Sequence, residues 1–266
     1  MSARETTVLE RILAETREEV ARRKRVLPLG QIAAERSRDE AGSGRLRDAL
    51  RAPGIGVIAE FKRRSPSAGT LREEPDLVEI VSAYERGGAV AVSVLTEGPN
   101  FEGALEDLRL ARATCALPLL RKDFVVDPYQ LYEAIAAGAD AVLLIVAALD
   151  QEQLASLHGE ARSIGLDVLV EVHDRDELQR ALAVGAEIAG INNRDLRDFS
   201  VDVQRTERLM DEVPPGVVVV SESGIVDAAQ LSSLRERGVQ AVLVGEALMR
   251  SGDPEAALRE LRSAKS

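Results

Sequence analysis

The stretch GADAVLLIV, residues 138–146, joins a glycine to a short apolar segment, and the same cassette recurs in the chain. The other copies are GGAVAVSVL from residue 87, GAEIAGIN from 185 and GVQAVLVG from 238. In each copy the glycine is placed to end a helix in the left-handed conformation, which other residues adopt only with strain. The apolar run that follows predicts a buried strand. The chain therefore repeats a helix–turn–strand unit.

A second kind of predicted strand lies between these copies and is introduced by Pro or Gly. Its members are GIGVIAEFK, LPLLRKDF, GLDVLVEV and PPGVVVVSES. Together the two kinds predict eight strands, with ends near Phe61, Thr96, Lys122, Val146, Val172, Asn192, Glu222 and Gly245. Helical patterns fill the gaps, and near-continuous apolar strands separated by helices are typical of a parallel sheet. The pattern favours a (βα)8 TIM barrel over an open doubly wound sheet, which rarely carries eight regular units.

The N-terminal part of the chain lies outside the repeat. Residues 7–24 place apolar side chains on one helical face, the polar stretch 35–45 indicates a loop, and a helical turn follows at 46–50. We expect residues 1–50 to form a helical extension packed on the barrel. Residues 51–266 would form the barrel itself, the whole being a single domain.

Composition limits the partners of this chain. Its 34 basic and 45 acidic residues give a net charge of −11, which disfavours binding to nucleic acid or to an anionic membrane. No apolar run approaches the ~20 residues that span a bilayer, and no apolar signal core is visible near the N-terminus. The single cysteine, Cys115, rules out an intrachain disulfide and fits a reducing compartment. We expect a cytoplasmic protein.

Polar side chains appear at the last positions of several predicted strands. They are Glu60 and Lys62, Arg121 to Asp123, Glu171, Asn192 to Asp195, Ser221 to Gly224, and Gly245 with Glu246. Any one of them alone is typical of a solvated loop, but the carboxyl ends of barrel strands meet at one rim. Six such ends together predict a shared pocket. Ser223-Gly224 and Gly245 precede helical segments, where backbone N–H groups commonly bind phosphate.

Eight motifs, in order and at matching spacing, resemble those of the indole-3-glycerol phosphate synthase family. They are IAEFKRRSPSAG at 58–69, LTEGPNFEG at 95–103, LLRKDFVVDPYQ at 119–130, ADAVLLIV at 139–146, LVEVHD at 169–174, GINNRDL at 190–196, SESGI at 221–225 and VGEALM at 244–249. The resemblance implies ring closure of 1-(2-carboxyphenylamino)-1-deoxyribulose 5-phosphate to indole-3-glycerol phosphate, with loss of CO2 and water. It implies no cofactor and no metal.

The resemblance also implies roles for particular side chains. Lys122 is implied as the general acid that protonates the substrate ketone, and Glu171 as the base or proton shuttle of the dehydration. Lys62 is expected to be the second acid, a clamp on the ring carboxylate or a phosphate contact, and these roles stay open. Arg194 is a second candidate clamp. The remaining implied residues are Glu60 and Asn192 as orienting groups, Glu222 as an active-site carboxyl, Phe101 and Leu143 as ring contacts, and Ser65, Ser223, Gly224 and Gly245 as phosphate contacts.

Two positions depart from the family pattern. Ala104 stands where the family often has Ser, and Glu246 stands where it has a small hydroxyl. The second departure removes one expected phosphate hydrogen bond. The expected partner is a phosphorylated small molecule, with the chain a monomer or weak homo-oligomer that contacts other enzymes of tryptophan biosynthesis.

Other reactive side chains are assigned no chemistry. We expect His158 and His173 to be structural or exposed, with His173 pointing away from Glu171, and the basic run 22–25 to be a solvated helix end. Cys115 precedes the third strand, at the wrong end of the barrel. A phosphoribosylanthranilate isomerase, which uses a Cys and an Asp at strand ends, and a non-catalytic barrel that binds a sugar phosphate remain as alternatives.

Overall fold

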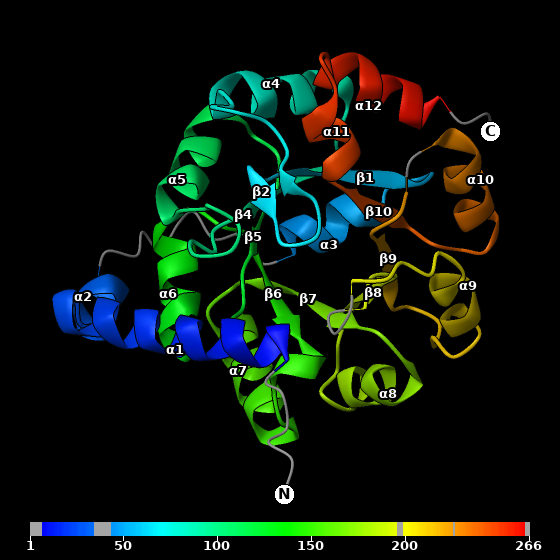
Figure 1. The fold of residues 1–266 in the computed structure, drawn as a ribbon. Helices are drawn as coiled ribbons and strands as arrows, with labels where there is room; N and C mark the ends of the chain where they lie inside the picture. The colour runs from blue at the N-terminus through cyan, green and yellow to red at the C-terminus, as the bar shows by residue number, and fades with distance from the viewer. Residues whose placement is uncertain (1–6, 35–43, 196–198, 226, 264–266) are drawn as a thin grey trace, which may run out of the picture.

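Eight parallel strands close into a barrel in the computed structural model, which describes residues 7–34, 44–195, 199–225 and 227–263 (Figure 1). The barrel strands are β1 (Gly56–Phe61), β4 (Ala91–Leu95), β5 (Leu119–Lys122), β6 (Ala141–Ile145), β7 (Asp167–Val172), β8 (Ile188–Asn192), β9 (Val218–Glu222) and β10 (Ala241–Val244). Each pairs with its neighbours in the chain, and β1 closes the ring between β10 and β4. The predicted barrel is confirmed, and each strand ends within one residue of its predicted end.

Helices form an outer layer around this ring, as Figure 1 shows. They are α4 (Leu77–Gly87), α5 (Leu105–Thr114), α6 (Pro128–Ala136), α7 (Gln151–Ser163), α8 (Arg175–Ala183), α9 (Gln204–Met210), α10 (Ala228–Glu236), α11 (Glu246–Arg250) and α12 (Pro254–Arg262). The cassette glycines end helices as predicted: Gly88 and Gly138 have φ of 87° and 86°. No described helix has the length and apolar character needed to cross a bilayer.

Several short elements were not predicted from the sequence. A hairpin of β2 (Arg64–Ser65) and β3 (Gly69–Thr70) follows β1, and a 3-10 turn (Val146–Ala148) follows β6. The N-terminal extension contains α1 (Val8–Val26), α2 (Leu29–Ala34) and α3 (Arg45–Leu50). Most of the predicted loop at 35–45 lies outside the described residues. The strands of the hairpin are two residues long, which is too short for a periodic signal.

Helix α3 covers the amino ends of the strands. The Asp167 carboxylate of β7 accepts hydrogen bonds from the backbone N–H groups of Leu46 and Arg47, at 2.9 and 3.1 Å. Leu46 is fully buried, so the start of the helix is fixed to the barrel floor. Nearby, Asp140 pairs with Arg45 at 2.6 Å and with a second arginine from α5. These hydrogen bonds and ion pairs attach α3 to this end of the barrel.

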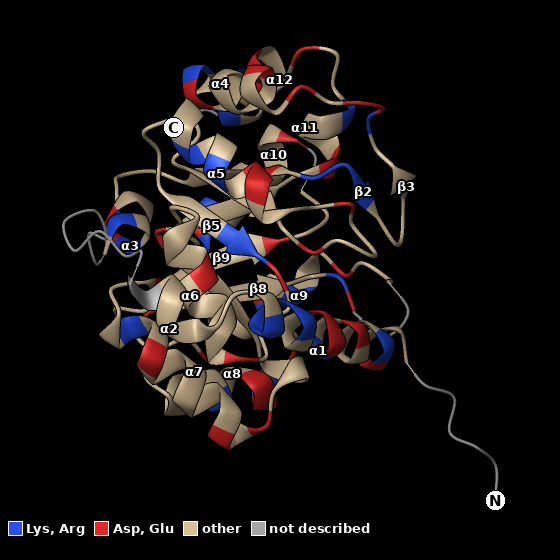
Figure 2. Cartoon of the chain, turned by 90° about the vertical axis from the view of Figure 1, so that its left-hand side faces the viewer, with Lys and Arg blue, Asp and Glu red and all other residues tan. Residues whose placement is uncertain are grey.

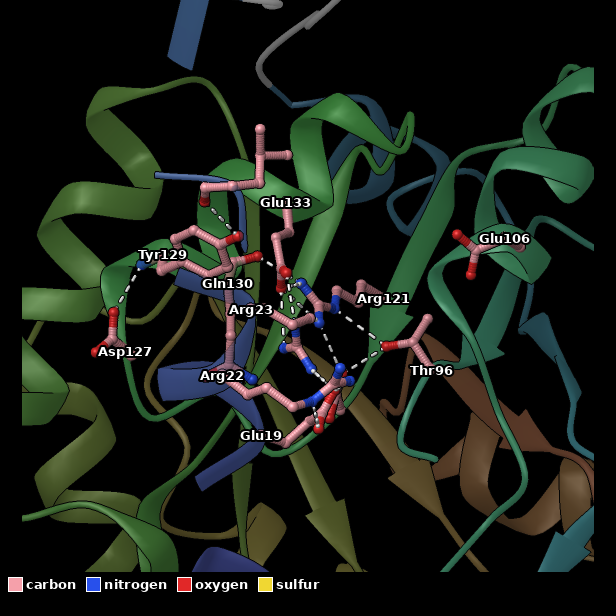
Figure 3. A network of polar contacts seen from close by, with 12 residues as sticks. Glu19, Arg22, Arg23, Thr96, Glu106, Arg121, Asp127, Tyr129, Gln130 and Glu133 are labelled. Atoms are coloured by element: carbon pink, nitrogen blue, oxygen red, sulfur yellow. Dashed lines mark hydrogen bonds and ion pairs between the residues drawn. The ribbon is translucent and has the colours of Figure 1, made fainter. Parts of the chain in front are cut away.

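The N-terminal helix α1 is attached to the barrel by a buried ionic network (Figure 3). Arg23 of α1 donates to both oxygens of Glu133 on α6, at 2.7 and 3.1 Å. Glu133 in turn lies 3.3 Å from the buried guanidinium of Arg121 on β5. The prediction that the basic run 22–25 is a solvated helix end is therefore wrong for Arg23, although Arg22 is 62% exposed. The partner of Arg23 lies far away in the sequence, which is why periodicity alone missed it.

Candidate active site

A cavity of about 520 Å³ lies at the carboxyl ends of the strands. Every predicted site residue lines it: Glu60, Lys62, Ser65, Phe101, Lys122, Leu143, Glu171, Asn192, Arg194, Glu222, Ser223, Gly224 and Gly245. The expected pocket therefore exists, and it is built mainly from strand ends and the loops that follow them. Its wall also includes residues that the sequence did not single out, among them Phe124, Phe199 and Arg250.

Lys122, the last residue of β5, lies between two carboxylates. Its Nζ is 3.0 Å from Glu171 Oε2 and 3.4 Å from Glu222 Oε2. The side chain of Lys122 is 14% exposed, and both glutamates are almost fully buried. Burial alone lowers the pKa of Lys122, but Glu171, Glu222 and Glu60 outweigh it and hold the pKa above its usual value. The amine is therefore a charged donor at the cavity. In Figure 2 the basic end of β5 is the blue part of this strand.

The Glu171 carboxylate is held at both oxygens. Oε2 accepts from Lys122, while Oε1 accepts from Asn192 Nδ2 on the next strand at 3.1 Å. Burial raises the pKa of Glu171, but the charge of Lys122, followed by His173 and Asn192, brings it below its usual range. Glu171 is therefore an ionised acceptor with a fixed orientation.

Glu222 is in a different state from Glu171. Its Oε1 is buried and has no hydrogen-bond partner among the described residues. Burial raises the pKa of Glu222, Lys122 opposes that effect, and Glu171 and Glu60 add to it, so that the pKa is about 7. Two neighbouring carboxyl groups with pKa values pushed apart are typical of sites that move protons.

A second ammonium–carboxylate pair lies at the end of β1. Lys62 Nζ is 2.6 Å from Glu60 Oε1, and the Lys62 side chain is 17% exposed at the cavity. A Cβ at position 245 would come 2.5 Å from Glu60 Oε1. Gly245 is therefore required for the Glu60 carboxylate to take this position. This requirement is separate from any contact between the Gly245 backbone and a ligand.

A tight turn follows β9 and lines the cavity. Ser223 and Gly224 both have positive φ, 66° and 81°. The strained Ser223 is held by Asn193, whose side-chain amide donates to the Ser223 carbonyl at 3.0 Å. The β2–β3 hairpin adds Ser65 to the same cavity, and the Ser65 Oγ accepts from the N–H of Ala68 at 3.2 Å. Such a concentration of N–H and hydroxyl donors suits an anion.

Apolar side chains line the part of the cavity nearest to β4, β5 and β6, beside the strand ends that carry the charged groups. Phe101 lines the cavity with its ring centroid 6.4 Å from that of Phe124, and Leu143 joins them. The buried Glu97 fixes the Phe101 loop by accepting from the N–H groups of Asn100 and Phe101, at 2.8 and 3.0 Å. Helix α1 contacts the same loop, since Asn100 Nδ2 donates to Glu15 at 3.0 Å.

Some strand-end residues do not share the pocket. Arg121 points outward, where its guanidinium is buried against α6 and donates to the Gln130 carbonyl at 2.6 Å (Figure 3). Asn193 also faces away from the cavity, towards Thr206 and Ser221. Both flank residues that do point inward, so alternation along the strand accounts for their direction.

The prediction that His173 points away from Glu171 is wrong. Its Nε2 lies 3.4 Å from Glu171 Oε1. Residues two apart on a strand share a face, so alternation itself places the two side chains together. By contrast, His158 is buried in α7 as a structural residue, and Cys115 is buried at the carboxyl end of α5, where the chain enters β5 at the opposite end from the cavity. No cluster of three metal-ligating side chains is found within the described ranges.

A sequence model of the indole-3-glycerol phosphate synthase family matches residues 9–261. The chain belongs to this family. An indole-3-glycerol phosphate synthase of Aromatoleum aromaticum is 49% identical over 96% of this chain and 98% of its own length. One from Mycobacteroides abscessus is 47% identical over 97% of this chain and 94% of its own length.

Solved structures of proteins with other names share this fold. A mutant tryptophan synthase α-subunit from Pyrococcus furiosus has a TM-score of 0.60 at 15% identity, over 78% of this chain and 98% of that one. A thiamine phosphate pyrophosphorylase from the same organism has a TM-score of 0.61 at 20% identity, over 82% and 96% of the two chains. At such identities the likeness shows the barrel and nothing of its chemistry.

Proposed function

We propose that this protein is an indole-3-glycerol phosphate synthase. It closes the indole ring of 1-(2-carboxyphenylamino)-1-deoxyribulose 5-phosphate and releases indole-3-glycerol phosphate, CO2 and water. The observation that carries the proposal is the Lys122 ammonium, held between Glu171 and Glu222 inside the cavity. A site that only binds sugar phosphates has no use for a charged acid beside two carboxyl groups of different protonation state.

Substrate binding divides the cavity into three parts. The phosphate lies against Ser65, the Ser223-Gly224 turn and the backbone at Gly245, because these groups offer donors without a negative charge. The aromatic ring packs on Phe101 and Leu143. The ring carboxylate is gripped by Arg194, whose planar guanidinium can make two parallel bonds to it. This arrangement brings the substrate ketone towards Lys122.

Ring closure begins when the aromatic carbon attacks the ketone carbon. Negative charge develops on the ketone oxygen, and Lys122 donates a proton to it. The ring carboxylate then leaves as CO2, and its electron pair restores the aromatic ring. Glu171 and Glu222 keep Lys122 charged before the step, and the nearest proton source for its recovery is the Glu222 carboxyl, whose pKa is about 7.

Dehydration completes the reaction. Glu171 takes a proton from the carbon that becomes part of the indole double bond, while Lys62 donates a proton to the departing hydroxyl. Glu60 and Asn192 orient these groups, since Glu60 pairs with Lys62 and Asn192 donates to Glu171. A base and an acid on different strands suit a step that adds and removes protons at two atoms.

Three further assignments accompany this function. We propose that the extension 1–50 and the barrel 51–266 act as one domain, supported by the Arg23–Glu133 pair. A cytoplasmic location is supported by the chain's single cysteine, which is buried. The protein is proposed to act as a monomer or weak homo-oligomer that contacts other enzymes of tryptophan biosynthesis, which light scattering with and without those enzymes tests.

The deciding experiment incubates the purified chain with the carboxyphenylamino-deoxyribulose phosphate and follows indole absorbance. We expect turnover that needs no added metal or cofactor. A parallel reaction with phosphoribosylanthranilate tests the isomerase alternative, which the position of Cys115 disfavours, so Cys115→Ala should leave indole formation intact. Turnover of phosphoribosylanthranilate alone, or binding of both compounds without reaction, would overturn the proposal.

A further inference from the structure

His173 lies immediately beyond β7 and directly behind the Glu171 carboxylate. Its side chain is 10% exposed, and it is not among the residues that line the cavity. The structure therefore gives it no place in the cavity wall. Nothing in the proposed reaction uses this ring, although it is the imidazole nearest to the reacting groups.

The ring of His173 lies between two carboxylates from different elements and is hydrogen-bonded to one of them, Glu177. Nε2 lies 3.4 Å from Glu171 Oε1, and Nδ1 lies 2.9 Å from Glu177 Oε2. The same Glu177 oxygen accepts the backbone N–H of His173 at 2.7 Å. Glu177 stands in the first turn of α8, so the helix fixes the ring from behind.

The charges around His173 favour its cationic form. Among the described residues, the charged groups that face the ring are Glu171 from its own strand and Glu177 from α8, with Lys122 of β5 on the far side of Glu171. Burial lowers the pKa of His173, but the two carboxylates outweigh burial and raise it to about 10. At neutral pH an imidazolium therefore stands between two anions.

The positive charge of His173 affects which of the two carboxyl groups beside Lys122 is ionised. Glu171 and Glu222 share one ammonium, Lys122, and two buried carboxylates beside one cation do not both ionise readily. His173 adds a positive charge on the Glu171 side only. It therefore distinguishes the two carboxyl groups, because Glu171 becomes the ionised member and Glu222 the one with the raised pKa.

We propose that His173, anchored by Glu177, is a positioning residue that orients Glu171 and selects it as the ionised carboxylate of the pair. The inference rests on the proposed function, since it concerns the base of that reaction. His173 acts through Glu171 and has no contact with the substrate.

Two substitutions of His173 distinguish the role of the nitrogen that faces Glu171 from the role of the nitrogen that faces Glu177. His173→Asn places an amide where Nδ1 was and removes the group near Glu171. His173→Gln places a neutral donor at the same number of bonds from the backbone as Nε2. Glu177→Gln leaves His173 in place but removes its anchoring charge. His158→Asn is the matched control, because His158 is also a buried histidine but lies on α7, away from Glu171.

We expect His173→Asn to lower kcat at least tenfold at neutral pH while KM stays within twofold. The acidic limb of the plot of kcat against pH should move up by about one pH unit. This limb reports the pKa of Glu171, which rises when the positive charge of His173 is removed. His173→Gln should recover part of kcat by orienting Glu171, but its acidic limb should stay as high as in His173→Asn, because a neutral amide does not favour the ionised form of Glu171. Glu177→Gln should move the limb in the same direction by less, and His158→Asn should match wild type. Indole formation by the wild-type enzyme is the reference. Its absence rejects the proposed function, whereas an active wild type with an equally active His173→Asn variant rejects the role of His173 alone.

An independent readout is the 15N chemical shift of the His173 imidazole, which reports its protonation without turnover. We expect the ring to stay protonated to about pH 9 in wild type, because its pKa is about 10, and to lose its proton at lower pH in Glu177→Gln. Wild-type kcat and pH profile in His173→Asn would overturn the inference. Equal losses in the Asn and Gln variants with an unmoved acidic limb would do the same, since they indicate packing alone.

Discussion

Gly190 of β8 leaves the space in which the Glu222 carboxylate of β9 lies, because a Cβ at position 190 would come 2.2 Å from Glu222 Oε1. Glu222 is almost fully buried at this point. A methyl group would therefore push the carboxylate towards Lys122 or out of the plane that it occupies. The absence of a side chain on one strand thus determines the position of a charge on the next.

Gly190→Ala should lower kcat by roughly 100-fold, since a displacement of about 1 Å at a reacting group can cost that much. Overpacking should also destabilise the fold by about 1–3 kcal/mol. The matched control is Gly159→Ala on α7, where nothing lies within 4 Å of the added Cβ. That change should leave kcat unaltered and stabilise the helix by about 0.5–1 kcal/mol. Steady-state kinetics and urea unfolding measure both effects, and equal activities of the two variants would contradict the argument.

Lys122→Ala should abolish detectable turnover, with a loss of at least roughly 100-fold from the missing general acid. The variant should still fold and bind indole-3-glycerol phosphate, since the phosphate and ring contacts are elsewhere in the cavity. Lys24→Ala, which removes a lysine of α1 that pairs with Asp127 at 2.6 Å, is the control and should keep full activity. Single-turnover kinetics and calorimetric product binding test the pair. Substantial turnover by the Lys122→Ala variant would disprove the role of the lysine.

Glu222→Gln should change how stability depends on pH. In the folded protein the pKa of Glu222 is about 7, above the ordinary 4.5 of a glutamate. Between these two values the folded state binds more protons than the unfolded state at this residue, so its contribution to stability falls as pH rises. The Gln variant lacks this loss. Its free energy of unfolding, relative to that of wild type, should therefore rise by about 3 kcal/mol between pH 4.5 and pH 7. Urea unfolding at both pH values checks the difference, and a constant difference would contradict it.

Glu133→Ala should destabilise the protein by about 3–5 kcal/mol, because it leaves the buried Arg121 guanidinium short of a carboxylate and releases α1. Arg23→Ala should cost less, since Arg23 is 26% exposed and water can replace part of its contact. Glu106→Ala removes a carboxylate that is 77% exposed and should change stability by less than about 0.5 kcal/mol. Thermal unfolding of the three variants should rank them in this order, and a reversed order would count against the buried network.

The sequence predicted most of the barrel because its signals are local. Glycines such as Gly138 end helices, apolar runs begin immediately afterwards, and a polar residue such as Lys122 marks where a strand reaches the rim. The same signals placed Lys122 and Glu171 in one pocket, because parallel strands present their carboxyl ends at one rim.

What the sequence could not predict depends on distant partners or on very short elements. The pairing of Arg23 with Glu133 joins residues far apart in the chain, and the β2–β3 hairpin is too short to have a period. His173 is a different case, since its direction followed from alternation and was predicted wrongly. Its partner Glu177 lies only four residues further on, in the first turn of the helix that Asp174 caps, so this contact was also within reach of the sequence.

The floor formed by α3, Asp140 and Asp167 has a consequence for redesign of this enzyme. Its charged contacts lie at the amino ends of the strands, and none of the residues that we assign to the reaction belongs to it. Substitutions at the floor can therefore alter stability without touching the residues that we assign to the reaction. A library confined to the floor can adjust the temperature range of the catalyst, while a library at the mouth can alter which compound it accepts.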